Sequence, residues 1–420
     1  MKLYNSYAQQ LEDFRPQVVG APVSLYVCGI TPYDTTHLGH AFTYVTADLL
    51  IRYLAYQGQQ VQYVQNVTDI DDDILEKASA EHEDWRQLGN QWTGHFIRDM
   101  QALNVRAPDR FPRATETIPQ IIETVQWLVQ IGVAYVAAGN VYFHIDAWPD
   151  FGRLSRLPRA EMLPVANERG NHPDDPHKRD PLDFVLWQAQ KPGEPGWNSP
   201  WGVGRPGWHI ECSTMATHLL GETIDIHMGG SDLLFPHHEC EIAQVTPITG
   251  KRFARYWMHV AMVRKDGEKM SKSLGNLVMV SDLLKRYSAN TLRLYLARHH
   301  YRHSWSYAEH ELQEAEAVAT KVAEAAGTAS DGTEGSALDA KSAEHDFTEA
   351  MDADLDTAHA LVAIEKLAAQ ILQAQQLGQA VGQAQQRLRT LCEVLGLYFE
   401  DDPPAAASWV DHLQRFAVAT

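Results

Sequence analysis

Cysteine is scarce in this chain, because four cysteines in 420 residues are too few for a disulfide framework. The chain has no run of ~18 apolar residues that could cross a membrane. The opening segment, MKLYNSYAQQLEDF, lacks the apolar stretch of a secretory signal. These absences predict a cytoplasmic protein without a membrane span, and the length leaves room for two or three domains with a large core.

Basic residues are also in short supply, since the formal net charge is −19. From Glu309 onward, 20 acidic residues stand against 6 basic ones, a net −14 that leaves only −5 for the rest of the chain. A partner held through phosphate contacts needs a basic surface. The C-terminal part is therefore predicted to be a poor general platform for RNA, although a local basic face remains compatible with this composition.

Four potential metal ligands stand out, three of them within GWHIECSTMATHLLGETIDIHMGGSDLLFPHHECE and one upstream in LYVCGITPYD. They are Cys28, Cys212, His237 and Glu241. Pro236 suits the first turn of a helix, which would place His237 and Glu241 on one face. Two thiolates, an imidazole and a carboxylate form a tetrahedral Zn²⁺ set, whereas ordinary buried thiols and a polar helix start are the alternative.

Two histidines mark a second candidate site. Val23–Cys28 is predicted to be a strand, and the apolar spacing of Leu38 to Leu54 predicts a helix after it. His37 and His40 then lie one turn apart at a helix N-terminus, which favours anions, and Gly39 allows a nucleotide close to the backbone. Two solvated histidines are the alternative.

A lysine-rich segment, RKDGEKMSKSLGN, follows a predicted strand over Tyr256–Val263. Lys269, Ser271 and Lys272 belong to it, and its serines and glycines predict a mobile cationic loop. Such a loop could hold phosphates, or it could be a solvated basic turn.

Two further turns follow predicted strands. Val61–Val67 leads into TDIDDDILEKA, whose aspartates could form a calcium loop, although their spacing is not that of an EF-hand and an acidic helix cap is the alternative. Ile224–Met228 leads into GGSD, a glycine-rich turn of the kind that binds ligands at a sheet edge. From spacing alone, Asp232 is a helix cap and Trp208 a core residue.

Periodicity and composition predict the remaining elements. Helices are expected at Trp85–Leu103, Ile118–Ile131, near Leu182–Trp187, at Ser281–Arg298 with Ser281 as the N-cap, at Phe347–Gln376 and at Ala384–Tyr398, with a strand at Val141–Ile145 and a linker at Ala326–Lys341.

HLGH and KMSKS resemble the two signatures of the class I aminoacyl-tRNA synthetases. Together with the potential zinc ligands, they make the chain, from about Lys2 to about Leu397, similar to cysteinyl-tRNA synthetase and to its relative, the mycothiol cysteine ligase. The resemblance implies an α/β fold with a split, Rossmann-like parallel sheet, an insertion and an α-helical C-terminal domain. We expect residues 1–114 and 206–308 to form the two catalytic halves, 115–205 the connective insertion and 309–420 the helical domain with its linker at 326–341.

The resemblance also implies roles for individual residues. His37, Gly39, His40, Lys269, Ser271 and Lys272 would bind ATP, with the two histidines and two lysines acting in catalysis; Thr68, Trp208 and Asp232 would bind cysteine; and Cys28, Cys212, His237 and Glu241 would hold one Zn²⁺ per subunit. ATP with Mg²⁺ and L-cysteine would give cysteinyl-adenylate. Zinc would favour cysteine over serine strongly enough that no editing site is needed.

The acceptor of the cysteinyl group is open between two classes. All four zinc positions and KRDPLDFVLW favour tRNA-Cys, which is the first choice. CGITPYDTTHLGHA, ERGNHPDDP at Glu168–Pro176, the acidic C-terminal part and the lack of a visible anticodon-binding domain favour glucosaminyl-inositol. A catalytically inactive relative is a third reading, which the intact signatures disfavour. A monomer is expected.

Overall fold

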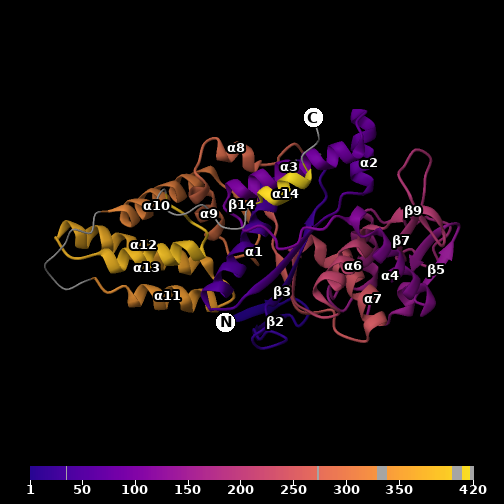
Figure 1. The fold of residues 1–420 in the computed structure, drawn as a ribbon, viewed down its shortest axis with the longest axis horizontal. Coiled ribbons are helices and arrows are strands. Elements are labelled where there is room, and N and C mark those ends of the chain that lie inside the picture. The colour runs from indigo at the N-terminus through magenta and orange to yellow at the C-terminus, as the bar shows by residue number, and fades with distance from the viewer. Residues whose placement is uncertain (35, 272–273, 329–337, 400–408, 417–420) are drawn as a thin grey trace.

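The computed structural model describes residues 1–34, 36–271, 274–328, 338–399 and 409–416. A sheet-containing centre joins a helical bundle on one side and a second sheet on the other (Figure 1). The α/β fold class with a helical C-terminal part is confirmed. Among the described helices, none is long and apolar enough to cross a membrane.

The centre is a four-stranded parallel sheet in the order β11-β10-β3-β4. Its strands are β3 (Val23–Ile30), β4 (Val61–Val67), β10 (Ile224–Gly230) and β11 (Ala254–Val260). Long buried runs in these strands fit a sheet covered on both faces. The order places strands from two distant parts of the chain side by side, as the split fold requires.

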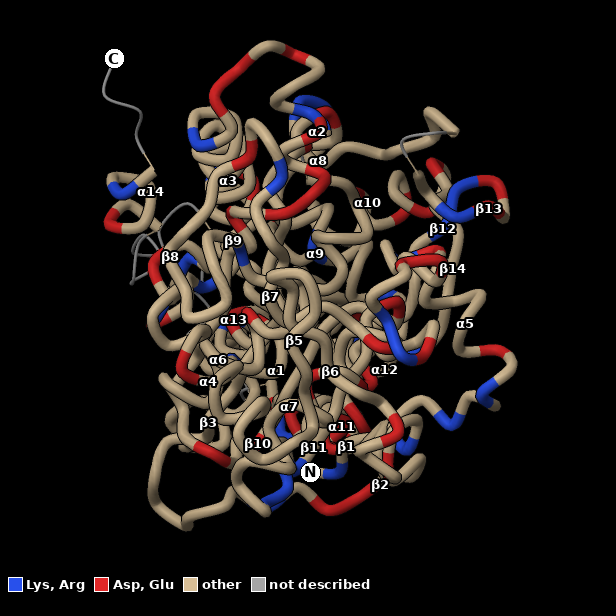
Figure 2. Tube along the Cα trace, turned by 90° about the vertical axis from the view of Figure 1, so that its right-hand side faces the viewer, with Lys and Arg blue, Asp and Glu red and all other residues tan. Residues whose placement is uncertain are grey.

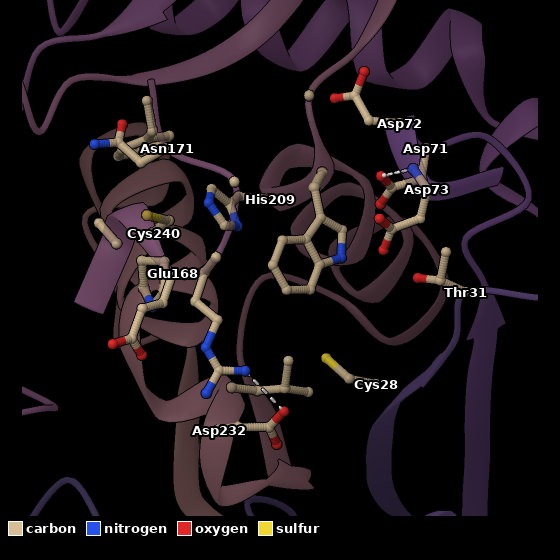
Figure 3. A pocket seen from close by; sticks show the side chains of 18 of the residues that line it. Cys28, Thr31, Asp71, Asp72, Asp73, Glu168, Asn171, His209, Asp232 and Cys240 are labelled. Carbon is tan, nitrogen blue, oxygen red and sulfur yellow. Dashed lines mark hydrogen bonds and ion pairs between the residues drawn. The ribbon is translucent and has the colours of Figure 1, made fainter. Parts of the chain in front are cut away.

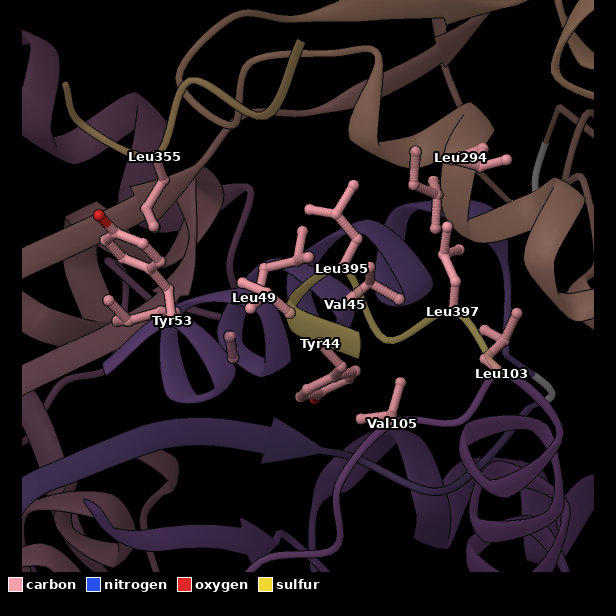
Figure 4. Close-up of a cluster of buried hydrophobic side chains, with 14 of the residues drawn as sticks. Tyr44, Val45, Leu49, Tyr53, Leu103, Val105, Leu294, Leu355, Leu395 and Leu397 are labelled. Atoms are coloured by element: carbon pink, nitrogen blue, oxygen red, sulfur yellow. The ribbon is translucent and has the colours of Figure 1, made fainter. Parts of the chain in front are cut away.

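Helix α1 (Leu38–Tyr56) connects β3 to β4 and carries the HLGH signature at its start. Tyr44, Val45, Leu49 and Tyr53 of this helix are all buried. Figure 4 shows them in one cluster with residues from distant segments, which are Leu103, Val105, Leu294, Leu355, Leu395 and Leu397. The middle of α1 therefore packs against segments that lie far from it in the sequence.

The region between β4 and β10 contains a five-stranded antiparallel sheet in the order β5-β6-β7-β9-β8. Its strands are β5 (Ala134–Ala137), β6 (Asn140–Phe143), β7 (Phe184–Ala189), β8 (Trp197–Ser199) and β9 (Gly202–Pro206). The prediction of a helix near Leu182–Trp187 is therefore wrong. That segment is a strand because β6 and β9 pair with it on both sides, which local composition does not reveal.

Helices surround these sheets. They are α2 (Asp72–Glu81), α3 (Trp85–Ala102), α4 (Ile118–Gln130), α5 (Arg159–Asn167), α6 (Trp208–Leu220) and α7 (Glu239–Thr249). The helix predicted from Pro236 begins instead at Glu239, after an irregular turn over Leu234–His238. Short 3₁₀ turns occur at Ala114–Glu116, Ile145–Ala147 and Ser231–Leu233.

Two predicted helices in the part of the chain after β11 differ from the structure. The helix expected over Ser281–Arg298 is two helices, α8 (Val280–Leu284) and α9 (Ala289–Ala297), and Ser288 rather than Ser281 is the residue that caps α9. The helix expected over Phe347–Gln376 is also broken, because Asp354 and Leu355 have positive φ angles of 64° and 55°. The helices on either side of that break are α11 (Lys341–Asp352) and α12 (Thr357–Gln376).

The other elements of this part are α10 (Glu309–Gly327), α13 (Gly382–Val394) and α14 (Val410–Phe416). Residues 329–337 of the predicted linker lie outside the described residues. Helix α14 returns to α3 (Figure 1). Just before α14, Trp409 Nε1 donates to the carbonyl oxygen of Val105, which follows α3, at 2.8 Å.

Two small sheets complete the fold: β1 (Lys2–Asn5) with β2 (Gln10–Asp13), and β12 (Val263–Lys265) with β13 (Glu268–Lys269) and β14 (Trp305–Tyr307). The β12–β13 hairpin carries basic and acidic residues close together (Figure 2). It presents Lys269, from the KMSKS signature, as an exposed residue.

Candidate active site

A cavity of about 1200 Å³ opens where the parallel strands β3, β10 and β11 end. Its walls come from segments that precede and follow the five-stranded sheet in the chain, and from that sheet itself (Figure 3). It is lined by these predicted site residues: Cys28, His37, Gly39, His40, Trp208, Asp232, Lys269 and Ser271. Lys272 lies outside the described residues. The carboxyl ends of parallel strands are where α/β sheets usually bind ligands.

His37 caps the N-terminus of α1. Its Nδ1 accepts from the backbone N–H of Gly39 at 3.0 Å and of His40 at 3.4 Å. Burial lowers the pKa of His37 to about 4, so the imidazole is neutral at pH 7. Because Nδ1 accepts, the hydrogen of the neutral ring is on Nε2, which is free to donate to an anion.

His40 stacks on His37 with ring centroids 3.8 Å apart. Burial, together with the charge of His37, holds the pKa of His40 well below its usual range. Its Nδ1 is buried and has no hydrogen-bond partner among the described residues. A ligand that supplies a donor or acceptor here would satisfy that nitrogen.

The two signature segments are joined through the backbone. Leu38 N–H donates to Val278 O at 2.8 Å, and Val280 N–H donates to Thr36 O at 3.0 Å. Asn276 holds the lysine loop by accepting from Ser271 N–H at 2.8 Å and donating to Lys269 O at 3.1 Å. The start of α1 and the loop that carries Lys269 are therefore fixed relative to each other.

The four predicted metal ligands come together below the cavity. Cys28, Cys212, His237 and Glu241 are all buried, and one potential ligand atom from each lies within 4.8 Å of the others. His237 Nε2 is 3.3 Å from Glu241 Oε1, and Cys28 Sγ is 3.7 Å from the same oxygen. Burial raises the pKa of the Cys28 thiol and of the Glu241 carboxyl well above their usual values. A divalent cation fits this site, because it would stabilise anionic groups that burial otherwise disfavours.

Neighbouring histidines support these ligands and were not identified from the sequence. His227 Nε2 lies 2.9 Å from Glu241 Oε2, and His209 Nδ1 lies 2.9 Å from His237 Nδ1. Contacts of this kind orient metal-binding side chains. Among the described residues, potential ligand atoms of a second group, Cys28, His227, His238 and Glu241, also lie within 4.8 Å of one another. It has one thiol instead of two, so the set with Cys212 matches a thiolate-rich zinc site better.

The predicted cysteine-binding residues occupy different positions. Trp208 stacks on His237 with centroids 4.5 Å apart, which places the indole against one of the four candidate metal ligands. Asp232 reaches the cavity from the turn after β10. Thr68 is buried behind the wall, where it accepts from Asn66 Nδ2 at 3.3 Å, and it is not among the described residues that line the cavity.

The aspartate-rich turn has the structure of a helix cap. The Asp71 carboxylate accepts from Asp73 N–H at 3.3 Å at the start of α2. Burial, with the neighbouring Asp73 and Asp72, raises the pKa of Asp71 to about 6. Asp72 pairs with Arg205 of β9, so the turn connects the start of α2 to the five-stranded sheet, and both residues line the cavity.

Comparison with known families agrees with this geometry. Residues 15–317 match the model of the tRNA synthetases class I (C) catalytic domain, and residues 346–400 match the DALR domain. The chain is 46% identical over 326 residues to the cysteine–tRNA ligase of Thermodesulfovibrio yellowstonii, which covers 77% of this chain and 66% of that protein. It is 47% identical over 341 residues to the cysteine–tRNA ligase of Cronobacter sakazakii, which covers 81% and 72%. The chain thus spans about two thirds of the length of these relatives.

Solved structures show the same fold at low sequence identity. Mycobacterium tuberculosis methionyl-tRNA synthetase in complex with methionyl-adenylate aligns with a TM-score of 0.64 and 18% identity over 89% of each chain. The matching catalytic-domain model and the identity to the bacterial ligases decide the family. The chain belongs to the class I aminoacyl-tRNA synthetases, in the family of the cysteine–tRNA ligases.

Proposed function

We propose that this chain activates L-cysteine with ATP and transfers the cysteinyl group to tRNA-Cys. One observation carries the proposal: the buried set of Cys28, Cys212, His237 and Glu241 adjoins the cavity that both nucleotide signatures line. The set reaches that cavity at Cys28, which is one of its lining residues. A thiol-containing amino acid and ATP would therefore bind side by side.

In the first step, a carboxylate oxygen of cysteine bonds to the α-phosphorus of ATP. The bond from that phosphorus to the bridging oxygen breaks, and the electron pair leaves with pyrophosphate. His37 Nε2–H and the Lys269 ammonium would donate to the phosphate oxygens as charge moves onto them. A Cβ at Gly39 would lie 2.9 Å from Cε1 of His37, so the absent side chain leaves room for the His37 ring over the start of α1. Mg²⁺ would arrive with ATP. Lys272 would act with Lys269.

The four clustered residues would hold Zn²⁺. When bound, zinc supplies a position that accepts a thiolate but disfavours the hydroxyl of serine. Trp208 would flank the amino acid, and the Asp232 carboxylate would accept hydrogen bonds from its ammonium group. Thr68 would act from behind the wall, through Asn66, rather than by direct contact.

In the second step, a ribose hydroxyl at the 3′ end of the tRNA bonds to the cysteinyl carbonyl carbon, its proton leaves, and AMP departs with the electron pair of the broken bond. We propose that residues 115–205 form the connective insertion that contacts the acceptor end. Residues 1–114 and 206–308 would be the catalytic halves, and 309–420 the helical domain. The chain would act as a monomer in the cytoplasm.

The test offers purified protein ATP and cysteine, first in an ATP–pyrophosphate exchange assay and then with each acceptor separately. Cysteine-dependent exchange, weak exchange with serine and cysteinylation of tRNA-Cys are expected. Transfer to glucosaminyl-inositol instead of tRNA would overturn the proposed acceptor but keep the activation step. Absence of cysteine-dependent exchange in metal-replete protein would overturn the proposed function as a whole.

A further inference from the structure

We infer that Arg169, a residue of the insertion, positions Asp232 for binding the amino group of the amino-acid substrate. The inference rests on the proposed function, because Asp232 is expected to receive that ammonium group. Arg169 belongs to neither nucleotide signature and is not a candidate metal ligand. This role of Arg169 would give the region between the two proposed catalytic halves a part in selecting the amino acid.

The contact is a direct, monodentate ion pair. Arg169 Nη1 lies 3.1 Å from Asp232 Oδ2, and both residues line the cavity. Figure 3 labels Asp232 and draws this contact to its carboxylate as a dashed line. The Arg169 side chain is 23% exposed and that of Asp232 is 30% exposed, so neither is fully solvated. Among the residues that the structure describes, each side chain has this one hydrogen bond and no other. The carboxylate orientation therefore depends on Arg169.

The contact leaves half of the carboxylate available. An ionised carboxylate has two oxygens that accept hydrogen bonds, and Arg169 uses only Oδ2. Oδ1 folds back over Gly230, where a Cβ atom would lie 2.4 Å from it. Holding Oδ2 thus fixes Oδ1 at one place in the cavity, where a substrate ammonium can reach it.

Hydrogen bonds hold the backbone segment that carries Arg169 in place. Arg169 follows the C-terminus of α5, and its N–H donates to Ala166 O at 2.9 Å. Two residues later, Asn171 Nδ2 donates to Asn167 Oδ1 at 2.7 Å and to Pro181 O at 3.1 Å. Lys178 Nζ in turn donates to Asn171 Oδ1 at 2.6 Å. These bonds tie the segment to α5 on one side and to the approach to β7 on the other.

The charges also suit the substrate. Arg169 and Asp232 together are neutral, and a zwitterionic amino acid is neutral as well. Binding therefore adds no net charge to the cavity, whereas a lone Asp232 carboxylate would take up the ammonium in a less defined orientation. A charge-assisted contact of this kind contributes enough to change the KM for cysteine by about tenfold.

The experiment compares Arg169→Ala, Arg169→Lys and Arg159→Ala in the cysteine-dependent ATP–pyrophosphate exchange assay. Arg159 is a matched control, because it begins α5 and pairs with Asp146 and Asp180, with its side chain 55% exposed. Arg169→Ala should raise the KM for cysteine by about tenfold while kcat and the KM for ATP change less than about threefold. Arg169→Lys should recover most of the loss, and the control should behave as wild type.

An unchanged KM for cysteine in a folded Arg169→Ala protein would overturn the inference. So would an equal rise in the KM for ATP, because that result indicates general damage to the cavity. If the Arg169→Ala protein unfolds below the assay temperature, Arg169→Gln replaces it, and the KM for cysteine and the KM for ATP are judged in the same way. Wild-type protein that shows no exchange would overturn the proposed function, and this inference with it. If the wild type is active and replacing Arg169 has no effect, only the inference is overturned.

Discussion

His227 Nε2 lies 2.9 Å from Glu241 Oε2, and both side chains are fully buried beneath the cavity. His227 is fixed from its other side by Trp257, whose ring stacks on the imidazole with centroids 4.4 Å apart. Glu241 therefore presents its other oxygen, Oε1, to Cys28 and His237. The pair orients the carboxylate of the proposed metal site.

Replacing His227 with alanine should weaken metal binding by about 10- to 100-fold, because an orienting partner of a ligand is lost while the four ligands stay. Competition with a zinc chelator measures the affinity. His218→Ala is the control, since His218 is exposed at the end of α6. Equal affinities for the two variants would contradict the role given to His227.

Replacing Cys212 with serine should leave the fold intact but remove bound zinc and cysteine-dependent exchange, because a hydroxyl is a poor substitute for a thiolate ligand. Metal analysis and the exchange assay measure the two effects. Cys392→Ala is the control, as that thiol is buried in α13, far along the chain from the site. Normal zinc content and normal exchange in the serine variant would rule out the ligand set.

Replacing Arg293 with methionine should destabilise the protein by about 3–5 kcal/mol, since it leaves the buried Asp48 carboxylate without this partner. Arg293 Nη2 is 2.6 Å from Asp48 Oδ2, and Arg293 Nε donates to Leu395 O at 2.7 Å, which ties α1 to the end of α13. Thermal unfolding measures the loss. Arg298→Ala is the control, because its pair with Glu314 is partly exposed and should contribute less than about 1 kcal/mol.

Replacing Asp99 with asparagine should stabilise the protein more at pH 8 than at pH 5. Burial raises the pKa of Asp99 to about 6, and Oδ2 has no hydrogen-bond partner among the described residues. The folded state therefore holds this proton more tightly than the unfolded state, and stability falls as pH rises from about 4 to about 6.

Asparagine does not ionise, so the Asp99→Asn protein does not lose this stability as the pH rises. The gain in unfolding free energy should be larger at pH 8 by roughly 1 kcal/mol, after allowance for partial solvation. Unfolding midpoints of both proteins at the two pH values measure the difference. A gain that is the same at both pH values would show that Asp99 ionises normally.

The parts of the fold predicted well are those that local sequence determines. Val61–Val67 is β4 at the expected boundaries, and Asp71 caps α2, because alternation and capping act within a few residues. The helix expected near Leu182–Trp187 failed because strand pairing with β6 and β9 is a long-range effect. The prediction of one continuous helix through Asp354 failed for the same reason. The Asp354 carboxylate accepts from Tyr4 N–H and Tyr301 OH, both at 2.7 Å, and neither partner is near in sequence.

The candidate site divides in the same way. Its four metal ligands and two signatures carry recognisable residue patterns, and the structure brings all of their described members to one cavity and the layer beneath it. His209, His227 and Arg169 carry no such pattern. Each acts through a contact with a residue at least fourteen positions away, so only the folded chain reveals it.

The split of the central sheet has a consequence for how the protein folds. Cys28 lies in β3, whereas the other three ligands lie in or just before the helices that flank β10, and the two strands pair directly. The proposed metal site cannot form in full until that long-range pairing has formed, and closing such a long loop is slow. Uptake of a spectroscopically visible metal such as Co²⁺ during refolding would therefore report when the two catalytic halves come together.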